Sequence, residues 1–349
     1  MDLATFWFIV LGVLWTGYLV LEGFDFGVGM LLPVLGGKRY ASDDADAEKR
    51  RRVLLNTIGP VWDGNEVWVL TAGGATFAAF PHWYATLFSG FYLPLLLILV
   101  ALIVRNLGFE YRHKRPEARW KARWDQAIFW GSLVPALLWG VALTNIVRGV
   151  PIDANKEFTG NLFSLLNPAG LLGGLVFVAL FLTHGAIFVA LKTDGKIRHE
   201  ARQIAGRVGI VAAVLAVALL LWIGLGDGKL ASWVTTVVAA AALLGALAAN
   251  RVGREGWAFI GTAVTIAMAV ATYFLVLFPN VMPSSTNPDW NLTIANASST
   301  DYTLKVMTIV ALIFTPIVLM YQGWTYWVFR KRLTVNHIPE DAPLEPVSR

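Results

Sequence analysis

Four carboxylic acids stand inside long apolar stretches of the sequence, in two pairs with the same spacing. Glu22 and Asp25 lie three residues apart, and so do Asp63 and Glu66. Residues three apart share one face of a helix. A carboxylate inside a bilayer costs at least ~2.5–3.5 kcal/mol, so it must face a cavity, contact a partner or stay protonated. The pattern predicts a proton route or an ion site; the structural alternative is a polar clamp between two helices.

The two acidic pairs are expected at the same depth. If the first helix ends near residue 34 and the second begins near 53, Asp25 and Asp63 lie nine and ten residues from the same membrane surface. At a rise of 1.5 Å per residue this is roughly 15 Å, near the middle of the bilayer. Matched depth lets the acids meet between two helices and favours a function over the clamp.

Residues around the acids would shape such a site. Pro60 is expected to bend the second helix, and Gly64 removes bulk so that a helix or water can approach. Gly23 and Gly27 form a small-residue face that flanks Asp25 and suits close packing of the first helix. The second acidic pair is also accompanied by Trp62, Asn65 and Trp68.

Histidine and arginine offer fewer candidates for chemistry. His184 is the one histidine of five that is expected deep inside a span. It could ligate a haem, but a hydrogen-bonded core histidine is the favoured interpretation. Arg105 and Asn106 are expected at the cytoplasmic end of the third span, where arginine commonly snorkels to the surface; contact with an anionic or quinone headgroup is the alternative. Cysteine is absent, which excludes disulfides and thiolate-ligated cofactors.

The elements that carry these side chains are predicted to be membrane-spanning helices. Hydrophobic residues make up 56% and charged residues 15%, and the mean hydropathy is +0.60; soluble domains carry roughly 25% charge. About 20 apolar residues cross the hydrocarbon, and continuous apolar runs without alternation exclude a barrel. The chain is therefore predicted to be all-α, a single transmembrane domain over 1–349 with nine spans near 5–34, 53–79, 83–107, 125–147, 167–191, 204–224, 232–249, 257–279 and 303–329.

The basic residues predict the orientation of the chain. All but four of the 28 Lys and Arg residues fall in loops on one side; the exceptions are Arg148, Lys156, Lys229 and Lys305. Positive loops stay in the cytoplasm, so the N-terminus is expected outside and the C-terminus in the cytoplasm, as an odd number of spans requires. The pI near 9.4 therefore reflects topology and does not indicate nucleic-acid binding. The first apolar run is too long for a cleavable signal peptide.

Three sequence blocks resemble the signatures of a known family. Residues 21–33 (LEGFDFGVGMLLP) and 59–74 (GPVWDGNEVWVLTAGG), continued by 77–81, resemble the first two helices of cytochrome bd oxidase subunit II. Residues 278–285 (FPNVMPSS) through 304–307 (LKVM) resemble its last external loop and ninth helix. The segment 125–265 is generic membrane sequence and adds only helix count.

The resemblance implies a fold, a partner and cofactors. It implies two four-helix bundles plus one extra helix, and a heterodimer with a haem-bearing subunit I that holds two haems b and one haem d. The resemblance does not decide whether small accessory subunits are present. No haem ligand is expected in this chain. A structural quinone is a further expectation. Carried over by motif, Asp63 and Trp68 correspond to the family's proton path towards the haem site, and Asp25 to its other acid; Glu22 and Glu66 have less certain roles.

The expected function is that of the haem-free subunit of a quinol:O₂ oxidoreductase in a bacterial or archaeal cell membrane. Quinol would be oxidised on the outside, O₂ reduced to water, and protons drawn from the cytoplasm through Asp63 and its neighbours. A secondary transporter with an acidic ion site between broken helices is the alternative, and it needs interrupted helices in corresponding halves of the chain. A stand-alone haem enzyme would need ligands that the sequence does not offer.

Overall fold

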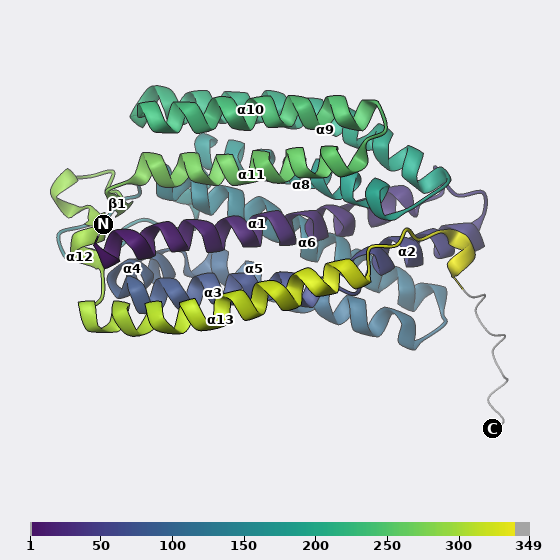
Figure 1. Cartoon of the computed structure of the whole chain (residues 1–349), viewed down its shortest axis with the longest axis horizontal. Helices are drawn as coiled ribbons and strands as arrows, with labels where there is room; N and C mark the ends of the chain where they lie inside the picture. Colours follow the sequence, from purple (N-terminus) through teal and green to yellow (C-terminus); the bar gives the residue numbers. More distant parts are fainter. Residues whose placement is uncertain (1, 339–349) are drawn as a thin grey trace.

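The computed structural model describes residues 2–338, and all long elements are helices that run roughly along one axis (Figure 1). The helices are α1 Leu3–Leu35, α2 Asp44–Ile58, α3 Trp62–Ala79, α4 Pro81–Gly90, α5 Tyr92–Tyr111, α6 Ala118–Arg148, α7 Leu162–Leu165, α8 Pro168–Lys192, α9 Lys196–Asp227, α10 Leu230–Arg251, α11 Glu255–Leu277, α12 Ile294–Ala297 and α13 Asp301–Val328. Short 3₁₀ turns lie at Arg112–Lys114, Pro288–Trp290 and Val335–His337. The predicted all-α class is confirmed.

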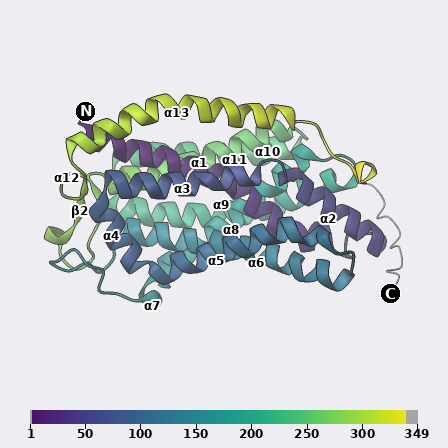
Figure 2. The ribbon, with the colours of Figure 1, turned by 90° about the horizontal axis from the view of Figure 1, so that it is seen from below.

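The long helices form two bundles with one helix outside them. α1, α3, α5 and α6 make the first bundle, in which α1 packs on α3 and α6, and α5 packs on α6. α8, α9, α10 and α11 make the second, and α1 and α6 join the two by packing on α8. α13 lies along the outside against α1 and α3, and Leu304 is its one buried residue (Figures 1 and 2).

Eight helices of the described part are long and apolar enough to cross a membrane. The second predicted span, 53–79, is not among them, because it is divided into α2 and α3 by a turn at Gly59–Val61. Proline at position 60 cannot donate the hydrogen bond that would continue α2, so the bend expected there is a full interruption. The third predicted span is likewise divided, into the short α4 and the long α5.

Glycines set the closest approach between the bundles. A side chain at Gly27 of α1 would lie 2.1 Å from the carbonyl oxygen of Phe181 and 2.7 Å from the Cα of Gly185 in α8. A side chain at Gly23 would meet the Phe181 ring. The small-residue face predicted beside Asp25 is thus confirmed, and it brings the backbones of α1 and α8 into contact.

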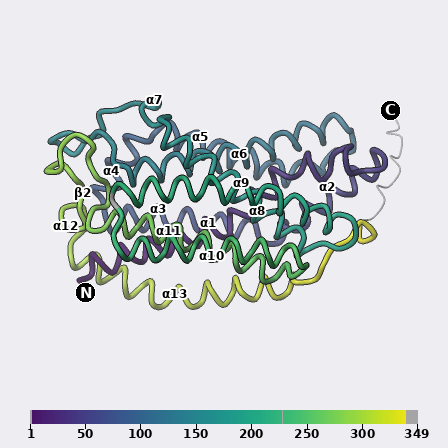
Figure 3. The backbone as a smooth tube through the Cα atoms, turned by 90° about the horizontal axis from the view of Figure 1, so that it is seen from above, coloured from purple at the N-terminus to yellow at the C-terminus, as the bar shows by residue number. Residues whose placement is uncertain are grey.

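The two ends of the molecule differ. At one end, the connections after α6 and α11 fold together: Asn280–Met282 (β1) pairs antiparallel with Leu292–Thr293 (β2), and Val150 bridges to Ser284. This small ribbon was not predicted by the sequence. At the other end, the loop after α13 returns over the bundle, where Leu333 bridges to Thr193 after α8. The tube in Figure 3 shows α12 and β2 at the first end and α2 at the second.

Candidate functional site

The first acidic pair lies in the core of the molecule. Glu22 and Asp25 of α1 are fully buried. They share a face because they stand three apart in a continuous helix. The residues from Phe26 to Leu32 that follow them in α1 are buried as well, so this stretch of the helix lies inside the chain.

A buried arginine from α5 joins both acidic pairs. The Arg105 guanidinium forms an ion pair with Glu22, and its Nη2 lies 3.5 Å from Oε2 of Glu66 in α3. Asn106 Nδ2 donates to the same Glu66 oxygen at 2.6 Å. The guanidinium also lies 4.8 Å above the centre of the Phe26 ring, a cation–π contact. One cation therefore serves two carboxylates, and the net charge of this group depends on where protons reside.

A second network, one turn away, ties α1 to α3 and α13. Asn65 Nδ2 donates to Asp25 Oδ2 at 2.8 Å. The side-chain oxygen Oδ1 of Asn65 accepts from the Tyr326 hydroxyl at 2.7 Å and from Gln322 Nε2 at 3.3 Å. Trp68 Nε1 donates to Gln322 Oε1 at 2.9 Å. Three helices thus contribute polar side chains at the depth of Asp25.

Several polar atoms of these networks have no hydrogen-bond partner within the described residues. They are buried, and they converge on the same region from α1 and α5: Glu22 Oε2, Asp25 Oδ1, Arg105 Nε and Nη1, and Asn106 Oδ1. Buried polar groups nearly always find a partner, and ordered water usually supplies it where protein atoms do not. The interior of this site is therefore suited to a chain of water molecules.

Asp63 does not join the buried group. It lies in the first turn of α3, and its side chain is exposed at the surface of this chain, beside the exposed Gly64 and Val67. The expectation that both acidic pairs meet is confirmed for Glu22, Asp25 and Glu66, and it is wrong for Asp63. The reason is the angular position on the helix: Asp63 stands two residues before Asn65, which is roughly 200° of rotation.

The position of Arg105 differs from the one expected from the sequence. Arg105 was expected to snorkel to the cytoplasmic surface, but it is fully buried. Six residues of α5 follow it, so its guanidinium cannot reach the surface and instead finds Glu22 across the bundle. The signal available in the sequence was this distance from the helix end, together with two unpaired acids at similar depth.

His184 is a core histidine in this structure. It is fully buried in α8, its Nδ1 is 2.6 Å from Thr262 Oγ1, and its Nε2 is 3.1 Å from the Val20 carbonyl oxygen. The ring stacks on Phe259 at 4.6 Å. Both ring nitrogens are occupied, so the residue does not fit axial ligation of a haem. The described residues contain no cluster of three or more His, Asp or Glu side chains placed to hold a metal ion.

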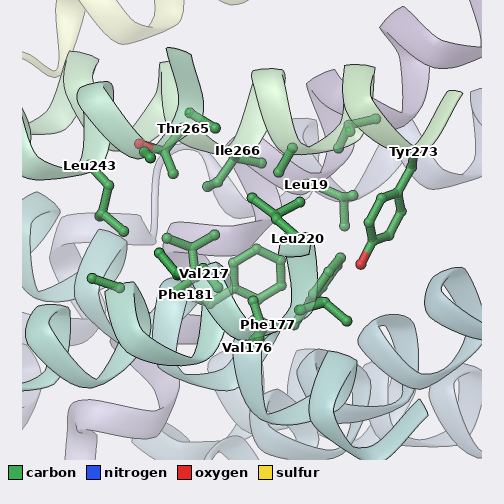
Figure 4. Close-up of a pocket in the computed structure, with 18 of the residues that line it drawn as sticks. Leu19, Val176, Phe177, Phe181, Val217, Leu220, Leu243, Thr265, Ile266 and Tyr273 are labelled. Carbon is green, nitrogen blue, oxygen red and sulfur yellow. The ribbon is translucent and has the colours of Figure 1, made fainter. Parts of the chain in front are cut away.

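An apolar cavity of about 100 Å³ lies between α1 and the second bundle (Figure 4). Its walls include Leu19, Phe181 and Ile266, and its two polar groups are already bonded: Thr265 Oγ1 donates to the Gly261 carbonyl at 2.8 Å, and the Tyr273 hydroxyl lies 3.1 Å from Thr144 Oγ1. A cavity of about 150 Å³ holds one benzene. This cavity does not fit a substituted quinone ring and has no available polar group to orient one.

A charged cluster at one end of the first bundle links Glu48 of α2 to the α5–α6 connection. Arg112 donates to both carboxylate oxygens of Glu48, at 2.9 and 2.7 Å, and its Nε donates to Asp125 at 2.5 Å. Burial alone would raise the pKa of Glu48, but the hydrogen bonds from Arg112 and Lys121 outweigh it, and the pKa is lowered. Glu48 therefore stays ionised near neutral pH and holds α2 against the α5–α6 connection.

Comparison with known proteins gives a consistent result. The family model described as cytochrome bd terminal oxidase subunit II matches residues 3–329. The chain is 42% identical over 339 residues to cytochrome bd ubiquinol oxidase subunit 2 of Bacillus subtilis (strain 168), with 95% of this chain and 97% of that protein covered. It is 37% identical over 374 residues to cytochrome bd-I ubiquinol oxidase subunit 2 of Escherichia coli (strain K12), with 96% of each covered.

The fold is also similar to a solved structure. A chain from the structure of bd oxidase from Geobacillus thermodenitrificans superposes with a TM-score of 0.76 over 95% of this chain and 100% of that chain. The sequence identity of that pair is 17%, so this likeness concerns the fold alone.

Proposed function

The chain belongs to the cytochrome bd terminal oxidase subunit II family, a multi-pass membrane family of bacterial oxidases, and we propose that it is the haem-free subunit that delivers cytoplasmic protons to its partner. The complex would oxidise quinol and reduce O₂ to water. The partner, subunit I, would hold two haems b and haem d and carry the electrons. Each O₂ reduced to two waters takes up four protons, so a route for protons is required.

The exposed position of Asp63 is the main support for this proposal. Asp63 is an exposed carboxylate on a face of α3 whose other exposed side chains include the apolar Val67, Leu70 and Phe77. Facing lipid, such a carboxylate would cost at least ~2.5–3.5 kcal/mol. A polar contact with a second subunit removes that cost. Because the haems would reside in the partner, protons must leave this chain at its surface, and Asp63 is a group able to pass them on.

The buried network would hold protons behind Asp63. Asp25, Glu22 and Glu66 can each accept a proton, and Arg105 stabilises whichever of them is ionised. The unpartnered atoms beside them suit the water molecules that a relay needs between carboxylates. Trp68 has an indole N–H that only donates, so its contribution is to position Gln322 and, through it, Asn65.

The route would begin at the interruption between α2 and α3. A groove of about 560 Å³ lies there, lined by residues that include Asn56, Gly59, Pro60, Lys192 and Lys331. It opens at the end of the molecule that is rich in basic residues, which is the cytoplasmic side under the positive-inside rule. Asp63 follows Pro60 by less than one helical turn, so water in this groove would reach the first turn of α3.

The alternative of a secondary transporter is less well supported. That class needs interruptions in corresponding positions of two halves. The first bundle contains interruptions between α2 and α3 and between α4 and α5, whereas α8, α9, α10 and α11 of the second bundle are continuous within the described residues. An ion site would also need ligands around one point, and Asp63 is directed away from Asp25.

Replacement of Asp63 by Asn tests the proposal. Asn keeps the shape and hydrogen-bonding capacity but cannot release a proton, so turnover should fall by roughly 10²-fold or more, a typical contribution of a positioned proton-transfer group. Haem content and subunit recovery should stay close to those of the parent complex. The measurement is quinol-driven O₂ consumption per haem d in the purified two-subunit complex.

Matched variants separate proton transfer from packing. Asp25→Asn is the companion change for the buried network, and Val67→Ala on the same α3 face is the control for altered contact without a lost proton site. Normal turnover per haem d in Asp63→Asn would remove this residue from the obligatory route. A loss of turnover in proportion to a loss of haem would instead support a structural clamp.

A further inference from the structure

A basic groove lies on the second bundle, far from the acidic network. It has a volume of about 730 Å³ and runs between the start of α9 and the end of α10. Its lining contains three arginines and a histidine and no acidic residue: His199, Arg202, Gln203, Gly206, Arg207, Ile210, Leu247, Ala248, Asn250 and Arg251. Gly206 leaves the floor open, because a side chain there would meet only Asn250, at 3.8 Å.

One arginine of the groove is fixed in place. Arg202 Nε and Nη2 donate to the Asn250 carbonyl oxygen at 3.1 and 2.9 Å, and Nη2 also donates to the Arg251 carbonyl oxygen at 3.1 Å. Asn250 Nδ2 donates back to the Arg202 carbonyl oxygen at 2.9 Å. Gly253 has a φ of +79°, and a side chain on it would lie 3.2 Å from the Arg202 guanidinium. Backbone carbonyls orient this cation without neutralising it.

The positive charge of the groove is not balanced by nearby acids. Glu255 is 3.8 Å from Arg202, but Arg198 binds the same carboxylate at 2.8 Å and Arg332 lies 3.5 Å from it. Three arginines therefore share the Glu255 carboxylate, and Asp194, 3.6 Å from Arg198, is the other acid beside them. Arg207 and Arg251 make no side-chain hydrogen bond or ion pair within the described residues, and both are exposed. The groove carries an excess of at least two positive charges.

The groove also sits at the level of a lipid headgroup. His199 and Arg202 precede the predicted span 204–224, and Asn250 and Arg251 follow the predicted span 232–249. Beyond the arginines, the same face becomes apolar and exposed, with Ile210, Val211 and Val214 on α9 and Leu244 on α10. α10 and α13 lie on opposite edges of the molecule (Figure 1). The groove is thus away from the α3 face on which the partner subunit is expected.

From these features we propose that the groove between α9 and α10 binds the phosphate headgroup of an anionic phospholipid of the cytoplasmic leaflet, with its acyl chains along Ile210 and Leu244. Basic pockets between helices at this level recognise such headgroups, because cations near the membrane surface attract the negative charge of the phosphate. The apolar stripe distinguishes a lipid from a free anion, since inorganic phosphate would leave it unoccupied. This inference does not depend on the proton route.

Photo-crosslinking in the two-subunit complex tests the inference. A benzophenone amino acid in place of Ile210 is irradiated in nanodiscs of equal parts phosphatidylglycerol and phosphatidylcholine, and the lipid adducts are quantified by mass spectrometry. Phosphatidylglycerol should be enriched by roughly tenfold, and Arg207→Gln with Arg251→Gln should reduce the enrichment to roughly one. Both side chains are exposed and make no hydrogen bond or ion pair within the described residues, so the variant should assemble normally.

Two controls make the outcome decisive. Lys114→Gln with Arg119→Gln removes two exposed cations at the same end of the molecule, outside the groove, and should leave the enrichment unchanged. Inorganic phosphate present during irradiation, compared with chloride at equal ionic strength, should not lower the yield of the phosphatidylglycerol adduct. The proposal would be overturned by equal adducts of both lipids in the parent complex or by an equal loss of enrichment in the control variant. A lower adduct yield with phosphate than with chloride would overturn it as well.

Discussion

The buried Arg105 determines what the acidic network can do. A single guanidinium shared by Glu22 and Glu66, with Asp25 one turn away, holds negative charge in an apolar interior where an isolated carboxylate would be neutral. Replacing such a pair by apolar groups is often tolerated, whereas removing one partner leaves a buried charge uncompensated. The stability of the first bundle should therefore depend on the pair more than on either residue.

A double-substitution cycle at Arg105 and Glu22 tests this dependence. Arg105→Met should destabilise the complex by about 3–5 kcal/mol, because Glu22 loses its counter-ion in the core. Adding Glu22→Gln should recover a substantial part, since the fully buried carboxylate is then removed and only the partly exposed Glu66 is left without its cation. The measurement is the melting temperature and the yield of the purified complex. Arg119→Met, an exposed control, should change neither. If the two substitutions lowered the melting temperature additively, Arg105 and Glu22 would not form an energetically coupled pair.

The sequence predicted the acids of this site but not their geometry. Spacing placed Glu22 with Asp25 and Asp63 with Glu66, and both pairs do lie on shared helix segments. Which face each helix turns inward depends on packing, and the break at Gly59–Val61 alters the rotation of α3 relative to a continuous helix. Spacing alone could not reveal this, so Asp63 was expected in the core although it lies at the surface.

At the scale of helices, the close contact of α1 with α8 positions the acidic pair. Gly27 follows Asp25 by two residues, and its Cα approaches the backbone of Gly185. Glycine is needed there for space and not for an unusual backbone conformation. Helices joined through small residues rely on van der Waals packing and tolerate little added volume. The contact of α1 with α8 therefore helps to set the position of Asp25 relative to α3, which packs on another side of α1.

Gly27→Ala tests the contact between α1 and α8. The added methyl group would overlap the Phe181 carbonyl and Gly185, so the change should destabilise the complex by roughly 1–3 kcal/mol and lower the melting temperature. Gly245→Ala in α10 is the matched control, because no atom lies within 4 Å of the added group. It should be neutral or slightly stabilising. Equal melting of the two variants would show that α1 and α8 are not closely packed.

Helix existence was more predictable than helix continuity. Long apolar runs predicted every membrane helix, because crossing the hydrocarbon demands length and satisfied backbone groups. The ends of α6 and α9 extend beyond the apolar runs, since charged residues such as Arg119 and Arg198 continue a helix in water. The β1–β2 ribbon lies in a loop rich in Pro, Ser and Asn. Its strands are too short to show an alternating pattern in the sequence, so they could not be predicted.

At the scale of the molecule, the side formed by α3, α5 and α13 is left uncovered. α13 has one buried residue, and exposed apolar side chains of α3, α5 and α13 include Leu70, Leu97 and Ile313. Lipid or a second subunit must cover them. Asp63 lies on this side and distinguishes the two, because lipid cannot satisfy a carboxylate. The same surface therefore accounts for both the proposed partner and the proposed exit of protons.

The orientation of the whole chain decides whether this exit serves cytoplasmic protons. Under the positive-inside rule, the connections that hold β1, β2 and α12 lie outside, and the basic connection at Arg112–Lys114 lies in the cytoplasm. The native chain has no cysteine, so one introduced thiol reports one position. Ser285 and His113 are exposed at opposite ends, and their side chains make no hydrogen bond within the described residues, so replacing them should not disturb the fold.

Ser285→Cys should react with a membrane-impermeant maleimide in intact spheroplasts, whereas His113→Cys should react only after permeabilisation. The physical reason is the charge asymmetry of the connections: translocating the loops that carry most of the 28 Lys and Arg residues would oppose the membrane potential, at about 2.3 kcal/mol per charge per 100 mV. The measurement is the mass shift of the chain, with the cysteine-free parent as control. Labelling with the opposite pattern would invert the topology, and the groove beside Pro60 would then draw protons from the outside.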